Sequence, residues 1–451
     1  MSPSRLPTRL LNVGGDGSSI IKLQKTKGMN TPLNYIVLSF VWGSGGTSTG
    51  EGLTFPHNIE DHERGIDFSR LPKACRDAIT ITRELGIEYL WIDSLCIVQG
   101  PDGDFAEEAR SMEGIFNNSY CLLAACSSSS IQQGFLEPRQ PRRTVSLGSL
   151  TGEALVLCEL VDDFERDVDL SPLYSRGWTL QERTLARRTI FFTSKQMYWQ
   201  CGEGIRCETL TKMSNFRAGL YGSPDFPKSF LAKTKISPVS IFKDLYKTYS
   251  RLQFSNWADR PIAILGLEHR LSRETGCKSR HGIVLGKPEY LGQSLMWRAA
   301  TETGMCTIKF PSQRQPPSWS WMAYTGEISY LDLRPGEVEW ESSISMIGTE
   351  SSANECSGES STSSSLSAQC LDFNRENLAE ACYDGPEDAA REDQKCVIVG
   401  RSPGSDDAQS TFYLLLIARG GPGNIYLRIG VALAESKALS LRVSPEDVVI
   451  I

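Results

Sequence analysis

Histidine is scarce in this chain of 451 residues, which contains only four. A Ser-His-Asp or Cys-His arrangement therefore has few candidate bases. His269 and His281 lie in expected helical and linker segments, away from any pattern typical of an activated serine or cysteine. His57 and His62 lie in a polar loop without the additional ligands that a zinc site needs. The sequence indicates neither a conventional hydrolase nor a metal site.

Motifs for phosphate binding and ester hydrolysis are also missing. The chain has no Walker A sequence and no complete G-x-G-x-x-G after an expected strand. Residues 46–50 fit G-x-S-x-G, but "EGLTFPHN" follows them. A nucleophile elbow must lead directly into a helix, which this segment does not. We therefore expect no bound cofactor.

Long apolar runs and basic blocks are absent. "FYLLLIA" (412–418) is much shorter than the ~20 residues that span a bilayer, and the first residues lack the apolar core of a signal peptide. The net charge is -7, without a lysine and arginine cluster typical of nucleic-acid binding. Thirteen cysteines lie scattered without close pairs, which is typical of reduced thiols. We expect a cytoplasmic protein with no membrane span and no nucleic-acid partner.

Apolar segments alternate with amphipathic ones in the first half of the chain. "NYIVLSFVW" (34–42), "EYLWIDSLCIV" (88–98) and "CLLAAC" (121–126) have the composition of buried strands. Helical spacing of apolar residues fills 71–87 and 104–121 between them. This alternation predicts an α/β fold with a mainly parallel sheet flanked by helices.

The remainder of the chain differs in composition from this part. We expect a helical segment, then a β-rich C-terminal region interrupted by a serine-rich and acidic insertion that is too polar to fold. The expected divisions are N-terminal strands or an extension at 1–30, the α/β domain at 31–205, the helical segment at 206–300, the β-rich region at 301–348 and 395–451, and the disordered insertion at 349–394.

Polar residues gather where the first two buried strands end. Ser39, Trp42 and Gly43 follow one strand, and Asp93 and Gln99 follow the other. In a doubly wound sheet these carboxyl ends form the ligand crevice. The alternative is structural: the tryptophan is a core anchor and the aspartate caps a turn. Cys96, between them, then serves as a small apolar side chain.

A second group lies in "YSRGWTLQER" (174–183), just ahead of another apolar run. It contains Arg176, Trp178, Gln181 and Glu182. Trp178 and Glu182 are four residues apart and share one helix face. The segment is either a surface helix whose tryptophan fills the core, or a turn that holds Glu182 for chemistry.

Together these segments resemble the fungal heterokaryon incompatibility (HET) domain. The matching motifs occur in family order over about residues 31–201, with Phe40 and Phe116 where tyrosine is usual. They are "NYIVLSFVWG", "LPKACRDAI", "LGIEYLWIDSLCIVQ", "DFAEEARSMEGIFNNS", "SRGWTLQERTLARRTIFF" and "MYWQC". The resemblance implies intracellular non-self recognition and the induction of programmed cell death.

HET domains are similar in turn to Toll/interleukin-1 receptor (TIR) domains, which have a flavodoxin-like fold. Some TIR domains cleave NAD with a glutamate four residues after a tryptophan, the spacing of Trp178 and Glu182. The resemblance thus implies a TIR/flavodoxin-like sheet, Glu182 as the catalytic carboxylate and NAD as a substrate. The residues expected to bind substrate are Ser39, Trp42, Gly43, Asp93, Gln99, Arg176 and Trp178. The alternative is a non-catalytic signalling module that associates with itself or with other incompatibility proteins.

Overall fold

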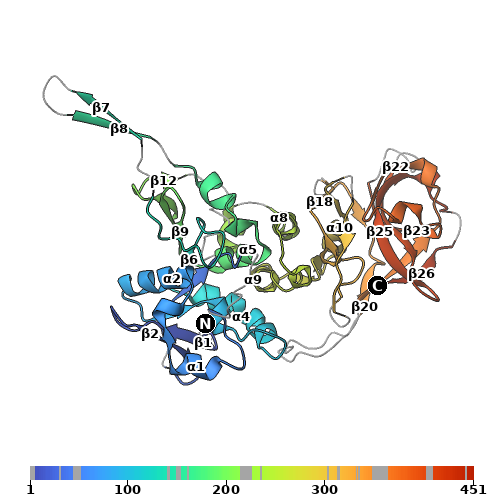
Figure 1. Ribbon diagram of the computed structural model, residues 1–451. Helices are drawn as coiled ribbons and strands as arrows, with labels where there is room; N and C mark the ends of the chain where they lie inside the picture. Colours follow the sequence, from blue (N-terminus) through green and yellow to red (C-terminus); the bar gives the residue numbers. More distant parts are fainter. Residues whose placement is uncertain are drawn as a thin grey trace. The chain divides into compact units, whose positions relative to one another are not determined.

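Four parallel strands form the centre of a sheet in the computed structural model (Figure 1). In chain order they are β3 (Tyr35–Ser39), β5 (Tyr89–Trp91), β6 (Cys121–Ala124) and β9 (Thr189–Phe192). Across the sheet they stand in the order β9-β6-β3-β5, and each neighbouring pair is parallel. The prediction that the first three apolar runs are central neighbours of one parallel sheet is therefore confirmed.

Antiparallel strands extend this sheet at both edges. The ten described strands run in the order β12-β11-β10-β9-β6-β3-β5-β1-β2-β4. The added strands are β1 (Arg9–Asn12), β2 (Ile20–Lys25) and β4 (Ile66–Asp67) on one side, and β10 (Met197–Cys201), β11 (Gly204–Cys207) and β12 (Lys212–Met213) on the other. The expected mainly parallel sheet is thus correct for its centre and wrong for its edges. Consecutive hairpins add β10, β11 and β12 on one side, whereas on the other side β1 pairs with β5 and β4 pairs with β2 across longer stretches of chain.

The chain divides into two units. The structure describes residues 6–29, 32–43, 52–139, 143–148, 154–159, 162–213, 226–233, 236–301, 304–311, 315–331, 333, 336–347, 364–402, 410–441 and 444–451. The first unit is Met1–Thr234 with Ile262–Arg270, and the second is Lys235–Pro261 with Leu271–Ile451. None of the helices formed by these residues has the length and apolar content that crossing a membrane requires.

Helices connect the parallel strands of the first unit. α2 (Lys73–Glu84) joins β3 to β5, α4 (Phe105–Asn118) joins β5 to β6, and α5 (Gly177–Leu185) lies ahead of β9. α2 buries Ala74, Ala78 and Ile79, and it ends beside Gly86, whose φ of 67° favours glycine. Numbered along the chain, the parallel strands stand in the order 2-1-3-4. The order reverses between β3 and β6, and ligands of open α/β sheets bind beside such a reversal.

The second predicted strand is shorter than its apolar composition suggested. β5 ends at Trp91, and α3 (Asp93–Cys96) forms a single turn where we expected the strand to continue to 98. The Asp93 side chain accepts the backbone N–H of Ser94 at 2.7 Å, and Cys96 N–H bonds to the Ile92 carbonyl at 2.7 Å. An aspartate that bonds to its local backbone competes with the sheet in this way.

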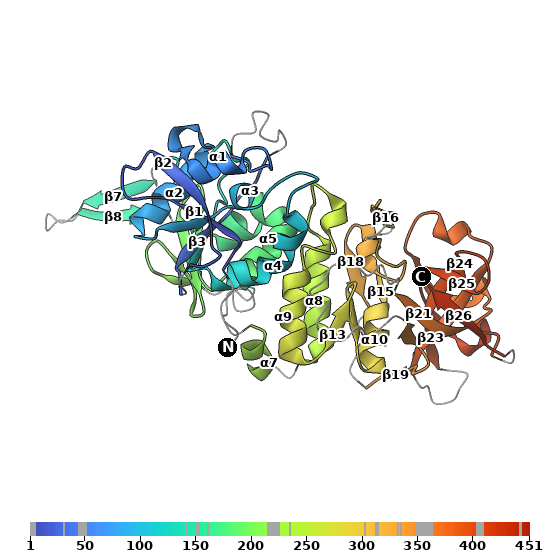
Figure 2. The ribbon, with the colours of Figure 1, turned by 90° about the horizontal axis from the view of Figure 1, so that it is seen from below.

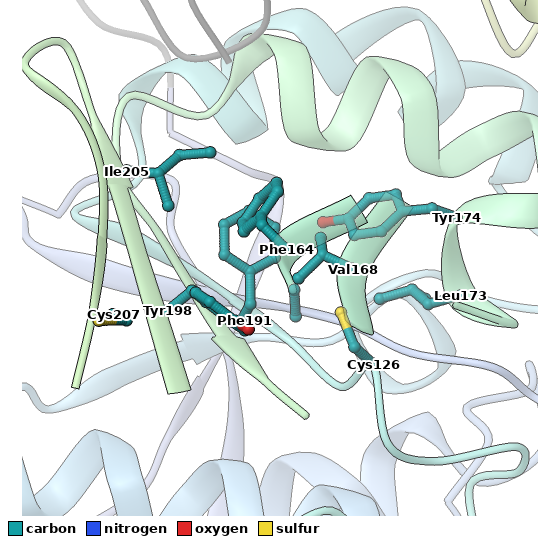
Figure 3. Close-up of a cluster of buried hydrophobic side chains, with 10 residues drawn as sticks. Cys126, Phe164, Val168, Leu173, Tyr174, Phe191, Tyr198, Ile205 and Cys207 are labelled. Atoms are coloured by element: carbon teal, nitrogen blue, oxygen red, sulfur yellow. The ribbon is translucent and has the colours of Figure 1, made fainter. Parts of the chain in front are cut away.

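An aromatic cluster lies beside β9 and β10 (Figure 3). The ring of Phe164 meets Phe191 and Tyr198 edge to face, with centroids 5.4 and 5.2 Å apart. Leu173 and Tyr174, which precede α5, pack into the same cluster. The entry into α5 is therefore fixed by the core of the first unit.

The second unit combines short helices with an eight-stranded sheet that is antiparallel except for one parallel pair (Figure 2). Its helices include α8 (Pro238–Ser250) and α10 (Pro288–Leu295), and α9 (Leu265–Thr275) begins in the first unit and ends in the second. The sheet contains β19 (Glu339–Trp340), β20 (Ser345–Ile347), β21 (Ser365–Leu371), β22 (Leu378–Tyr383), β23 (Gln394–Ser402), β24 (Thr411–Arg419), β25 (Ile425–Glu435) and β26 (Glu446–Ile450).

The expectation of disorder over 349–394 was wrong for the part that the structure describes. Residues 349–363 lie outside the described residues, but β21 and β22 occupy much of 364–394. Leu366, Ala368 and Cys370 alternate along β21 and are at most 2% exposed. This period-two pattern buries one face of the strand. The polar composition of the segment had predicted disorder because it does not reveal this alternation.

Candidate functional site

The last residue of the central strand β3 contacts helix α5. Ser39 is 2% exposed, and its Oγ donates a hydrogen bond to Oε2 of Glu182. Ser39 pairs with Ala124 at the end of β6, so this contact lies at the reversal of strand order. Two residues that are 143 positions apart in the sequence are thereby brought together.

Packing on the other faces of α5 determines where Glu182 points. Leu180 and Leu185 are 8% and 1% exposed and face the core. Trp178, one turn before Glu182, meets the ring of Phe105 from α4 edge to face, with centroids 5.7 Å apart. The indole is thus half-buried between the two helices. The Gln181 side chain instead packs against Gly266. A Cβ at that glycine would lie 2.9 Å from Oε1 of Gln181.

The proton affinity of Glu182 is unusual. Burial of its carboxyl group raises the pKa to about 7. The hydrogen bond from Ser39 and the charge of Arg176 act in the opposite direction, while the negative charge of Asp93 raises the pKa further. A carboxyl group with a pKa near neutrality can both donate and accept a proton at physiological pH.

Asp93 and Trp42 form a second contact at the same edge of the sheet. Nε1 of Trp42 donates to Oδ2 of Asp93 at 3.0 Å. Burial raises the pKa of Asp93, and the bonds from Trp42 and Ser94 and the charge of Arg176 oppose this shift. Trp42 is itself held by stacking on Phe40, with ring centroids 6.5 Å apart. Both acids therefore lie in a poorly hydrated environment, and among the described residues the donors that bond to their carboxyl groups are neutral.

The remaining candidates support the backbone around these pairs. Nη1 of Arg176 donates to the Phe40 carbonyl at 2.7 Å. Nε2 of Gln99 donates to the carbonyls of Asp93 and Ile97 at 3.3 and 3.1 Å. Gly43 has a φ of 90°, and a Cβ on it would lie 2.8 Å from Cβ of Ser130. These three residues therefore fix the backbone at the edge of the sheet.

The expected absence of a metal site rested on sequence alone. Among the residues that the structure describes, no group of three or more His, Cys, Asp or Glu side chains is placed to hold an ion. His62 instead shares a hydrogen bond of 2.9 Å with Thr54.

Comparison with known proteins finds a family match and a relative. Residues 35–182 match the family model described as "Heterokaryon incompatibility protein (HET)". This segment is therefore similar to the HET family. The chain is also similar to "Heterokaryon incompatibility protein 6, OR allele" of Neurospora crassa, with 23% identity over 289 residues. That alignment covers 54% of this chain and 40% of the relative, so the chain spans about two fifths of the relative's length. No solved structure matches the chain.

The HET domain match begins with β3 and ends at Glu182, so it contains every candidate residue named above. Both polar pairs, Ser39–Glu182 and Trp42–Asp93, belong to this matched segment. These comparisons support an incompatibility-type protein.

Sequence reasoning missed one buried ion pair, which joins Asp169 inside the matched segment to Arg183 just after it. Nη1 of Arg183 lies 2.6 Å from Oδ1 of Asp169, and the two side chains are 6% and 5% exposed. The guanidinium also lies over the ring of Tyr174, 4.9 Å from its centroid. Arg183 directly follows Glu182, so this pair fixes the helix turn that presents the candidate acid. The available signal was an arginine and several aspartates among aromatic residues, which also fits an exposed charged surface.

Proposed function

We propose that this chain acts in the cytoplasm in heterokaryon-incompatibility-type non-self recognition and induces programmed cell death. We further propose that its HET domain does so by cleaving NAD at the bond between nicotinamide and ribose, with Glu182 as the catalytic carboxylate. The family match and the Neurospora relative support the biological role. The contact between Glu182 and Ser39 carries the chemical proposal.

The position of that contact favours a ligand site. The parallel strands stand in the order 2-1-3-4, which agrees with the start of the flavodoxin-like order, and in such folds the ligand binds beside the reversal. Ser39 ends the strand at this place. We therefore propose a TIR/flavodoxin-like relationship for the central part of the sheet.

The electrostatics suit a reaction that develops positive charge. When the glycosidic bond breaks, its electron pair leaves with the nicotinamide nitrogen, and the ribose gains oxocarbenium character. Ionised Glu182, reinforced by the charge of nearby Asp93, would stabilise that charge and accept hydrogen bonds from the ribose hydroxyls. Water then adds to the ribose carbon and releases its proton to the carboxylate or to solvent. A cationic substrate also favours the ionised form of an acid whose pKa is near 7.

The decisive test is Glu182→Gln, compared with Glu107→Gln as the matched control. Glu107 is an exposed residue of α4. Expression of the wild-type chain or the control should deplete cellular NAD and kill the cells. The Glu182→Gln variant should fold but do neither, and purified wild-type protein should release nicotinamide from NAD. A folded Glu182→Gln variant that kills and consumes NAD normally would reject the catalytic role.

A non-catalytic module is the second candidate, and one observation favours it. The hairpin of β7 (Thr144–Gly148) and β8 (Ala154–Cys158) exposes Val145, Leu147 and Val156 by 60%, 47% and 51%. Such exposed apolar groups are typical of association surfaces, here with a second copy of this chain. In that case Val145→Asp should abolish both self-association and killing, while Glu182→Gln leaves them intact.

A further inference from the structure

A polar cavity lies at the first turn of α2, separate from the Ser39–Glu182 pair. Its volume is about 300 Å³. Several side chains that can donate hydrogen bonds line it, together with Pro72, and they are Ser69, Arg70, Lys73, Arg76 and Gln132. Three of the lining residues are cationic and lie within seven positions of one another. The cavity therefore presents several donors and a concentration of positive charge.

Two of these cations, Lys73 and Arg76, differ in how fully the described residues pair them. Nζ of Lys73 lies 2.7 Å from Oε1 of Glu137 and 3.8 Å from Oδ2 of Asp77, so its charge is already paired. Nε of Arg76 is shielded from solvent and has no hydrogen-bond partner among the described residues. A buried donor without a partner is rare in native structures, because losing the hydrogen bonds it makes to water costs free energy. Nε of Arg76 therefore has bonding capacity that the described part of the chain does not use.

Backbone hydrogen bonds hold the wall of this cavity in place. Ala74 N–H donates to the Ile131 carbonyl at 3.0 Å, and Ile131 N–H donates to the Trp42 carbonyl at 3.4 Å. Asp77 accepts the backbone N–H of Phe135 at 2.7 Å. The segment that carries Gln132 is thus fixed to α2 and to the chain that leaves β3, so the cavity is formed before any ligand arrives.

We propose that this cavity binds the phosphate group of a soluble small molecule, with the guanidinium of Arg76 as its main anchor. Arginine suits this role because its planar group donates several hydrogen bonds in the geometry of phosphate oxygens. Arg70 adds charge, Lys73 adds an ammonium donor that is already paired with Glu137, and Ser69 and Gln132 add neutral donors. The volume also leaves room for more than one phosphate. The proposal does not rest on NAD cleavage or on Glu182.

Calorimetric titration of the full chain with inorganic pyrophosphate tests the site. Arg76→Gln should bind roughly tenfold or more weakly, as expected when a charge-assisted hydrogen-bonding group is lost. Arg76→Lys keeps the charge without the planar donor group and should lie between the two. The matched control is Arg110→Gln, which removes the same charge from an exposed position on α4 and should bind like the wild type.

The control variant, phosphoinositide vesicles and the Glu182→Gln variant define the results that would overturn or support this site. Equal binding by Arg76→Gln and the wild type, or an equal loss in Arg110→Gln, overturns the proposal. Binding to phosphoinositide vesicles without binding to soluble pyrophosphate also overturns it, because the ligand would then be a lipid headgroup. Glu182→Gln should bind pyrophosphate normally, so failure of the catalytic proposal leaves this site intact.

Discussion

Asp384 in the C-terminal unit and Glu182 in the segment that matches the HET family are both desolvated acids, but their partners differ. Asp384 and Arg428 are both fully buried, and Nε and Nη2 of the arginine lie 2.8 and 3.1 Å from the two carboxylate oxygens. Arg428 also donates to the carbonyls of Leu295 and Trp297 at 2.7 and 2.5 Å. Both carboxylate oxygens of Asp384 are therefore paired with a cation inside the fold.

Glu182 has no such cation. Among the described residues, no lysine or arginine nitrogen lies within salt-bridge distance of its carboxylate, which bonds to the hydroxyl of Ser39. Burial and Asp93 consequently leave its pKa near 7. A compensated acid stabilises one structure, whereas an uncompensated acid costs stability when ionised and is often retained for chemistry. The contrast suggests a structural role for Asp384 and a functional role for Glu182.

The largest effect should come from breaking the compensated pair. Asp384→Asn keeps the size of the side chain but leaves Arg428 charged and buried, which should cost about 3–5 kcal/mol. The free energy of opening can be measured for this unit alone from amide hydrogen exchange in β24 and β25. In the control, Glu339→Gln breaks an exposed pair with Arg401 and should cost less than ~1 kcal/mol. A loss of similar size in both variants would remove the distinction between buried and exposed pairs.

The uncompensated acid should have a smaller effect with a distinct pH dependence. The folded state holds the Glu182 proton more tightly than the unfolded state, because the pKa falls from about 7 to its ordinary value of 4.5 on unfolding. The contribution of Glu182 to the free energy of unfolding should therefore decrease between pH 4.5 and 7 and level off above that range. Glu182→Gln removes this contribution, so its stability relative to the wild type should rise by roughly 1–3 kcal/mol across the window.

Urea unfolding of the two proteins at several pH values measures that difference. Other groups titrate in both proteins and cancel when the two are subtracted. The exposed Glu107→Gln control should run parallel to the wild type. A Glu182→Gln curve parallel to the wild type would mean that Glu182 titrates as an ordinary surface acid.

The sequence predicted the elements around this acid better than its contacts. The apolar run that ends at Ser39, and the helical spacing of Ala74 and Ala78, are local patterns with strong periodicity. They were sufficient to predict the alternation of strands and helices along the chain and to place Ser39 at the end of a strand. The approach of Ser39 to Glu182 was expected only through the family resemblance and the geometry of parallel sheets.

Features that depend on distant partners could not be predicted. Asp169 and Arg183 have the composition of an exposed surface, and their burial depends on aromatic rings from several segments. Likewise, β21 is a strand because it pairs with β20, β23 and β26. Its serine-rich sequence predicted disorder when considered alone. In both cases neighbours that are remote in the sequence override local composition.

The smallest expected effect comes from Ser39→Ala, which tests the hydrogen bond that Glu182 receives from Ser39. The hydroxyl donates to the carboxylate and stabilises its ionised form, so it holds the pKa lower than burial alone would. Its removal should raise the pKa of Glu182 above 7 and cost about 0.5–1.5 kcal/mol of stability at pH values where Glu182 is ionised.

Carbon-13 NMR of the labelled glutamate carboxyl group measures that pKa directly. Ser129→Ala, which removes an exposed hydroxyl bonded to Gln133, should leave it unchanged. An unchanged pKa in Ser39→Ala would mean that the hydroxyl does not contact the ionised acid. If catalysis uses the carboxylate, the rising limb of the pH–rate profile should move upward together with the pKa.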